Sequence, residues 1–283
     1  MHRLDQARTY FLSLFEAEPG NGEVNLELGR LSAEAGDLED AMRFFHGAIF
    51  GVWPTDAAAN RLEARMELVE FLASRRDYQD VRSELLATTI ELPKNTTIQD
   101  RIAGLFVRCG DYESALDLYQ RSLRLNKNDL VALRGGAIAA FRRGEYETSK
   151  KYFDILLGMV HQLDPEAETL RQTLEYVLEL DPYGHNLSRN ERLQRTMQAF
   201  QEAGNQIKQC QNSLSTALAT DSGRWSELEP RMNMLRLRKD PALSSSALQL
   251  ISDIEQNLGN CGQLSPMDLA LSLIFRSQEG IEQ

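Results

Sequence analysis

The sequence lacks long apolar runs and paired cysteines. No stretch approaches the roughly 18 consecutive apolar residues of a membrane-spanning helix, and the N-terminus, MHRLDQARTY, has no apolar signal core. The three cysteines, Cys109, Cys210 and Cys261, form no CxxC pair and have no metal-ligand spacing. We therefore expect the chain, as written, in the cytoplasm. If an upstream segment carries a signal or an anchor, the expected location becomes periplasmic or membrane-anchored, and Cys210 and Cys261 could then form a disulfide.

Basic residues and helix breakers are also scarce. The 283 residues include 31 basic and 42 acidic side chains, which gives a net charge of −11. Such a chain is not expected to bind nucleic acid or an anionic membrane surface broadly, because phosphate contacts need a basic surface. Membrane insertion within this chain is not expected either, because no apolar run is long enough. Only 8 prolines and 18 glycines occur, and the abundant Leu, Ala, Glu and Arg are typical of a mostly helical protein.

Catalytic signatures are absent as well. The four histidines are scattered, and there is no HExxH, GxSxG, P-loop or GxGxxG motif. The many Asp and Glu residues are typical of a solvated helical surface, where carboxylate pairs on one face arise by chance. We therefore assign no catalytic residue, no metal ligand and no cofactor, and we predict that the chain is not an enzyme.

What the sequence does contain is an internal repeat. Four segments align on Gly36, Arg76, Gly110 and Gly144. The last three anchors are 34 residues apart, and the first interval is 40 because GVWPTDAAAN adds a six-residue insertion. Mostly small residues stand seven before and five after each anchor, and a large residue stands nine after it: Gly29, Val69, Ala103 and Ala137; Ala41, Val81, Ala115 and Ser149; Phe45, Leu85, Tyr119 and Phe153.

These positions resemble the tetratricopeptide repeat (TPR) family, whose period is 34 residues. The resemblance implies an all-α fold, a right-handed superhelix (α-solenoid) of about four to five helical hairpins. The small residues would let paired helices approach closely, and the large residue would dock the following hairpin. Gly or Asp at each turn is expected to end one helix and to cap the next. The segment AMRFFHGAIFGVWP also resembles a group of bacterial TPR proteins, which implies no activity.

The predicted TPR solenoid covers residues 1–188. It comprises the second helix of a partial repeat at 1–20, repeats at about 22–55, 62–95, 96–129 and 130–163, and a degenerate repeat at 164–188 in which LDPYGHNLS replaces the expected turn. Residues 189–283 are predicted to be helical without the period, as a cap on the solenoid or as a small separate bundle.

We expect four helices in this C-terminal region. The first, of about 30 residues, lies in RLQRTMQAFQEAGNQIKQCQNSLSTAL, and shorter ones lie in WSELEPRMNMLRLR, SALQLISDIEQNL and SPMDLALSLIFRS. The basic segment PRMNMLRLRKD is predicted to turn its methionines to the core and its arginines to water. The alternative is that it docks on an acidic partner or a lipid surface.

The resemblance also implies a concave groove lined by the first helix of each repeat. Registering the repeats places these candidate residues in the groove: Leu26, Arg30, Met66, Glu70, Asp100, Arg134, Ile138, Glu168 and Gln172. TPR domains that clamp a chaperone's C-terminal carboxylate carry Lys and Asn at such sites, whereas Glu70, Asp100 and Glu168 would repel an acidic tail. The groove is therefore expected to bind a basic or apolar segment, such as an amphipathic helix.

The predicted function is a non-catalytic interaction scaffold, bacterial in type, that binds a peptide or helix of a partner protein. The alternative is a structural or assembly subunit of a bacterial envelope complex of the secretion or pilus type, anchored through a segment upstream of Met1. Partner identity and oligomeric state do not follow from the sequence, because TPR surfaces vary while the buried positions persist.

Overall fold

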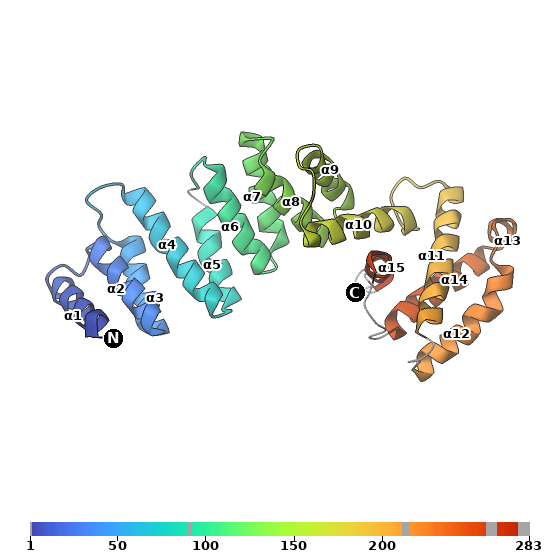
Figure 1. The fold of residues 1–283 in the computed structure, drawn as a ribbon, viewed down its shortest axis with the longest axis horizontal. Helices are drawn as coiled ribbons and strands as arrows, with labels where there is room; N and C mark the ends of the chain where they lie inside the picture. The colour runs from blue at the N-terminus through green and yellow to red at the C-terminus, as the bar shows by residue number, and fades with distance from the viewer. Residues whose placement is uncertain (1, 90–91, 211–214, 259–264, 277–283) are drawn as a thin grey trace. The chain divides into compact units, whose positions relative to one another are not determined.

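The computed structural model describes residues 2–89, 92–210, 215–258 and 265–276, and this part of the chain is mostly helical (Figure 1). It forms two compact units, residues 1–135 and 136–283, whose boundary lies inside helix α8. Unit 1 holds α1 (His2–Ala17), α2 (Gly22–Ala35), α3 (Leu38–Phe50), α4 (Ala57–Ser74), α5 (Tyr78–Thr88), α6 (Thr96–Arg108), α7 (Tyr112–Leu125) and the start of α8 (Leu130–Arg142). Unit 2 holds the rest of α8, α9 (Tyr146–Leu157), α10 (Pro165–Leu180), α11 (Arg189–Gln209), α12 (Thr216–Leu228), α13 (Met234–Lys239), α14 (Pro241–Asn257) and α15 (Pro266–Arg276).

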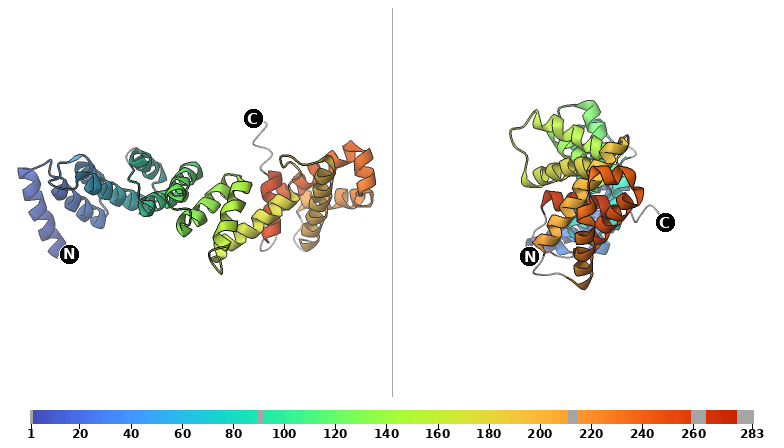
Figure 2. Two further views of the ribbon diagram at one scale, coloured as in Figure 1. Left: turned by 90° about the horizontal axis from the view of Figure 1, so that it is seen from above. Right: turned by 90° about the vertical axis from the view of Figure 1, so that its right-hand side faces the viewer.

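Unit 1 is built from antiparallel helical hairpins. Helices α2 and α3, α4 and α5, and α6 and α7 contact each other as pairs, and α3 with α4 and α5 with α6 join successive pairs. The helices follow one another side by side in chain order (Figure 2, left). Helix α1 contacts α2, so the partial repeat predicted at 1–20 supplies one helix to the stack. The predicted all-α solenoid of hairpins is confirmed.

The turn inside each hairpin has the predicted chemistry. Gly36, Gly110 and Gly144 have φ values of 76°, 74° and 77°, the left-handed region that favours glycine. Arg76 stands at the same repeat position with φ 63°, so the turn geometry is kept even where the sequence departs from glycine. The next residue caps the following helix with a side-chain oxygen in three of the four repeats: Asp37, Asp77 and Asp111.

The three repeat positions singled out by the alignment are buried in every repeat. Two of the large residues at these positions, Tyr119 and Phe45, pack against a helical glycine. A Cβ placed on Gly135 of α8 would lie 2.2 Å from Cζ of Tyr119, and one on Gly29 of α2 would lie 3.0 Å from Cδ1 of Phe45. Because any side chain at these glycines would displace the ring, the missing Cβ sets how closely the helices approach.

Unit 2 brings together segments that are far apart in the sequence. Helix α10 contacts α9, α11 and α15, so residues 165–180 lie beside residues 266–276 (Figure 1). Val177 of α10 shares one hydrophobic core with Phe200 of α11, Ile251 of α14 and Phe275 of α15. The domain boundary proposed after residue 188 falls within unit 2, and that division stays a prediction.

The predicted helix of about 30 residues is wrong, because the apolar stripe continues across a helix end. Helix α11 stops at Gln209, and Ser215 begins α12 by accepting the N–H of Leu218 at 3.1 Å. The segment expected as the next helix is divided among α12, a 3₁₀ turn at Glu229–Arg231 and α13. Pro230 lies at the break, where it can donate no backbone hydrogen bond.

The basic segment packs as predicted. Leu237 is buried, and Met232 and Met234 are half-buried against the cluster that Leu237 forms with Leu193 and Leu243. Arginines 231, 236 and 238 face solvent. The methionines therefore serve the core of unit 2.

Two further expectations, on membrane-spanning helices and on a disulfide, concern the cellular compartment of the protein. Every helix of the described residues is too short or too polar to cross a bilayer. Cys210 is buried at the end of α11, and Cys261 lies outside the described residues, so the proposed disulfide between them stays an expectation.

Replacing Gly204 of α11 by Ala is expected to destabilise the protein. The new Cβ would lie 2.2 Å from Cε2 of Trp225, whose ring stacks on Phe200 at 5.6 Å and donates Nε1–H to the Phe200 carbonyl at 3.1 Å. Such overpacking costs about 1–3 kcal/mol, more than the roughly 1 kcal/mol that Ala gains over Gly in a helix. Urea denaturation followed by circular dichroism should show a lower free energy of unfolding.

Gly223→Ala is the matched control. Gly223 also lies inside a helix, α12, but a Cβ added there would meet no atom of another residue within 4 Å. This substitution should raise the free energy of unfolding by up to about 1 kcal/mol. Equal effects of the two substitutions would contradict the proposed contact between the Gly204 backbone and the Trp225 ring.

Candidate binding surface

Helices α2 and α4 present a row of carboxylates on neighbouring faces. At about 100° per residue, residues three, four and seven apart share one face of a helix. This spacing places Arg30 with three glutamates on α2, and it groups three more glutamates on α4. We call these residues the acidic face: Glu23, Glu27, Arg30, Glu34, Glu63, Glu67 and Glu70.

Arg30 joins the two helices of the acidic face. Its Nε and Nη2 donate to the two carboxylate oxygens of Glu67 at 2.8 and 2.5 Å, and its Nη1 donates to Glu27 at 2.5 Å. Glu63 lies 3.7 Å from the same guanidinium, with its side chain 61% exposed. The hydrogen bond to Glu67 is the largest cause that raises the pKa of Arg30 above its ordinary value. One cation thus serves three carboxylates, and the face keeps a negative charge.

A second ion pair continues the row. Nε of Arg101 on α6 donates to Glu70 on α4 at 3.1 Å, and both side chains are about half exposed. Exposed pairs of this kind contribute only about 0–1 kcal/mol to stability. A cation from another molecule could therefore replace Arg101 at little cost.

The structure places the predicted groove residues in three environments. Arg30 and Glu70 lie on the acidic face, where their ion-pair partners belong to the chain itself. Arg134 of unit 1 is half-buried, and so are Glu168 and Gln172 on α10 of unit 2. The Glu168 carboxylate accepts hydrogen bonds from Arg171 and Gln172. The remaining four are buried: Leu26, Met66, Asp100 and Ile138. The binding role of all nine stays a prediction.

The repeat register missed most of the acidic face. It selected two positions per helix, whereas the glutamates of the acidic face occupy the positions three, four and seven residues away from Arg30 and from Glu63. Reading each first helix for charged residues at those spacings would have found them.

Asp100 is a buried carboxyl beneath the first-helix surface. Its side chain is 6% exposed, and its Oδ1 has no hydrogen-bond partner among the described residues. Burial raises its pKa to about 6; the neighbouring Asp129 carboxylate adds to the rise, while a hydrogen bond with Ser122 opposes it. Asp129 itself caps α8 by accepting the N–H groups of Val131 and Ala132.

Tyr119 of α7, whose ring packs against Gly135 of α8, is close enough to Asp100 to feel its charge. Burial, and then the charge of Asp100, raise the pKa of Tyr119 to about 12, while the charge of Arg134 opposes the rise. The Tyr119 hydroxyl therefore stays protonated across the physiological range, and we assign this cluster a structural role.

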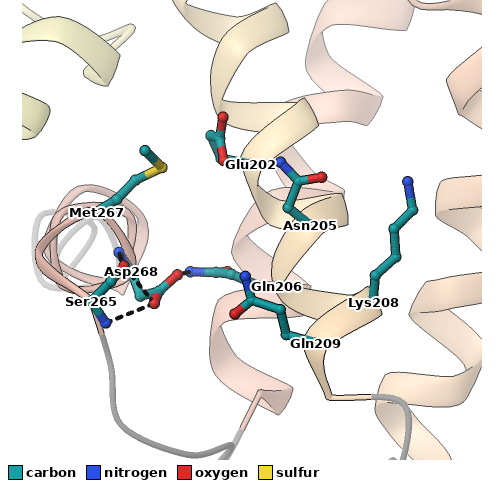
Figure 3. Close-up of a pocket in the computed structure, with 8 residues that line it drawn as sticks. All are labelled: Glu202, Asn205, Gln206, Lys208, Gln209, Ser265, Met267 and Asp268. Carbon is teal, nitrogen blue, oxygen red and sulfur yellow. Dashed lines mark hydrogen bonds between the residues drawn. The ribbon is translucent and has the colours of Figure 1, made fainter.

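A polar hollow of about 430 Å³ lies in unit 2 between α11 and the start of α15 (Figure 3). Nε2 of the buried Gln206 donates to Oδ1 of Asp268 at 2.9 Å. The N–H and the hydroxyl of Ser265 donate to Oδ2 of Asp268 at 2.8 and 2.7 Å. Asp268 is thereby used to cap α15 and to hold it against α11.

No metal centre is formed by the part of the chain that the structure describes, since no group of three or more His, Cys, Asp or Glu side chains is arranged to hold an ion. The acidic face of unit 1 gathers six glutamates and one arginine on α2 and α4.

Asp100→Asn tests the buried carboxyl. In the unfolded chain an Asp ionises near pH 3.9, whereas Asp100 in the folded chain ionises near pH 6. The unfolded state thus loses its proton first, so the Asp100 contribution to stability falls as pH rises from about 4 to about 6 and is constant above. The variant should exceed wild type at pH 7 by on the order of 1–2 kcal/mol, and the two should converge near pH 4.

Urea denaturation at several pH values measures this difference. Asp117→Asn, at an exposed carboxylate of α7, is the control and should show no comparable trend. A difference between Asp100→Asn and wild type that stays constant from pH 4 to pH 7 would rule out the raised pKa.

Comparison with known proteins agrees with this architecture. Two family profiles described as tetratricopeptide repeat match residues 1–59 and 100–131, and neither is a catalytic domain. DnaJ homolog subfamily C member 3 of Gallus gallus is 27% identical over 203 residues, which is 64% of this chain and 39% of that protein. The match thus spans well under half of that relative's length.

Solved structures with a similar fold share little sequence with the chain. YrrB, described as a TPR protein with an unusual peptide-binding site, is 16% identical with a TM-score of 0.44, covering 66% of this chain and 88% of that one. PilF of Pseudomonas aeruginosa is 15% identical with a TM-score of 0.41, covering 71% and 85%. MamA is 17% identical with a TM-score of 0.43, covering 59% and 88%. These values transfer no ligand to this chain.

The profile matches fall on hairpins whose anchors, caps and buried positions follow the repeat. Residues 1–59 and 100–131 of the chain are therefore assigned to tetratricopeptide repeats.

Proposed function

We propose that this interaction scaffold binds a segment of a partner protein rich in Lys and Arg along the acidic face of unit 1. Tetratricopeptide repeats serve protein–protein interaction, and the charge of the acidic face supports a basic partner segment. The observation that carries the proposal is the charge count on α2 and α4, where six glutamates share one face with a single arginine.

Part of that negative charge is accessible. Glu63 is 61% exposed and lies 3.7 Å from an Arg30 that already bonds Glu67 and Glu27 more closely. Glu23 and Glu34 are also exposed. Clustered charges of one sign steer oppositely charged partners during encounter, and their effect weakens as salt rises.

Apolar contact contributes less to the proposed site. Leu26 and Met66, the apolar candidates on α2 and α4, are only 6% and 4% exposed. A partner could not reach them without opening the hairpins. The proposal is therefore for a basic segment, and the amphipathic character predicted for the ligand is not needed.

We also propose the cytoplasm as the location of the chain as given. The envelope-complex role stays a prediction that depends on a signal or anchor upstream of Met1. Fractionation of cells that express the natural protein, with immunodetection in each fraction, tests both.

Reversing two charges on the acidic face should weaken binding of a basic peptide. The variant carries Glu34→Lys and Glu63→Lys, which change exposed side chains on α2 and α4. The probe is a labelled peptide of alternating Lys and Ser, titrated by fluorescence anisotropy at about 0.05 and 0.15 M salt. We expect at least about tenfold weaker binding at the lower salt and a smaller loss at the higher salt.

The matched control carries Glu39→Lys and Glu113→Lys, which alter net charge equally at exposed positions on the second helices α3 and α7. It should bind the peptide nearly as wild type does. If both variants lose the same affinity, binding follows net charge, and the acidic face is not the site.

A further inference from the structure

The six-residue insertion precedes a long helix, α4, and borders a cavity of unit 1. Helix α4 has 18 residues, whereas the first helices α2 and α6 have 14 and 13. The early turns of α4, the ends of α3 and α5 and the start of α6 enclose a pocket of about 980 Å³. We call it the insertion pocket. Its volume lies within the range of cavities that hold ligands or peptide side chains, about 300–1,000 Å³.

The insertion pocket lies on the opposite side of α4 from the acidic face. Arg61 and Arg65 line it, and each is two residues away from an acidic-face glutamate, Glu63 or Glu67. Two residues correspond to about 200° around a helix. A ligand in the insertion pocket would therefore not occupy the acidic face.

The charge of the insertion pocket is opposite to that of the chain. Among the described residues, its lining includes two arginines and no carboxylate, although acidic residues outnumber basic ones 42 to 31 in the sequence. Arg61 is exposed and donates from Nη2 to the Gly51 carbonyl at 3.1 Å, the one hydrogen bond described for it. Most of its N–H groups thus remain available for an anion.

Arg65 is partly neutralised inside the chain. Its Nε lies 3.6 Å from Glu84, and its guanidinium lies over the Phe50 ring at 6.0 Å. Glu84 is at the same time hydrogen-bonded to His46 at 2.9 Å, and this contact is the largest cause that lowers the Glu84 pKa. Arg61 therefore supplies the more accessible positive charge.

The first turn of α4 adds partial positive charge. Ala57, Ala58 and Ala59 line the insertion pocket with small side chains. Asp56, which precedes them with φ 46°, makes no side-chain capping hydrogen bond to the helix. Uncapped backbone N–H groups at a helix start favour an anion, in support of the two arginines.

The rest of the wall is apolar. Ile49 and Phe50 of α3, Leu62 of α4 and Ile98 of α6 contribute to it, and Phe50 is 75% exposed. An exposed aromatic ring beside a cavity offers contact area that a partner's side chain could bury. The pocket thus combines an apolar interior with accessible cationic groups.

We propose that the insertion pocket binds a short segment of a partner protein in which large apolar side chains are flanked by carboxylates. The apolar side chains occupy the cavity against Phe50 and Leu62, and a carboxylate bonds Arg61. This chemistry is complementary to that of the basic segment proposed for the acidic face, so the two sites select different ligands.

The test uses two labelled peptides with the same Leu-Leu-Phe centre, one flanked by Glu and the other by Gln. Wild type should bind the Glu peptide at least about tenfold more tightly by fluorescence anisotropy. Arg61→Glu should remove that preference, and Ala58→Trp, which fills the pocket from an exposed position, should weaken both peptides. Arg121→Glu, at an exposed arginine of α7, is the matched control and should leave both affinities unchanged.

Three results would overturn the proposal: equal binding of the two peptides, no binding of either, or the same loss in Arg121→Glu as in Arg61→Glu. Laurate, a fatty carboxylate, is titrated alongside by competition. If laurate binding depends on Arg61 while neither peptide binds, the site takes a lipid and the peptide assignment fails. Arg61→Glu should still bind the Lys-Ser peptide, so failure here is separable from failure of the acidic-face proposal.

Discussion

Between neighbouring helices of the repeats, a large ring lies directly against a backbone that has no side chain of its own. Tyr119 against Gly135 and Phe45 against Gly29 are the clearest cases. The contact works in both directions, because glycine permits the approach and the rigid ring fills the space that the absent Cβ leaves. The close approach of these helices depends on it.

This helix packing explains why the charges of α2 and α4 form one surface. Arg30 can bond Glu67 through two nitrogen atoms only because the first helices stand at a fixed spacing. The same rotation of α4 turns Arg61 and Arg65 to the other side, where the insertion has added helix length. One helix thus carries carboxylates on one face and arginines on the other, and a scaffold of this kind can present two chemically different sites within one unit.

The tetratricopeptide repeats account for the scaffold and leave the ligand open, because exposed residues are free to vary where buried ones are not. The acidic face and the insertion pocket therefore rest on the charges and contacts of this chain alone. Asp100 shows why residue type and repeat position alone do not identify a binding residue. Its repeat position suggested a ligand contact, but its side chain is buried.

The sequence alone determined the features that depend on local chemistry or on a fixed period. The left-handed turns at Gly36, Gly110 and Gly144, the Asp caps and the buried repeat positions all followed from it, because each requires a particular residue type at a particular spacing. Only the tertiary structure decided that α15 returns to lie beside α10 and that Met66 and Asp100 are buried. It also decided that the insertion pocket lies opposite the acidic face. Those outcomes depend on contacts between segments distant in the chain, and the energy of such contacts is not written in any single stretch of residues.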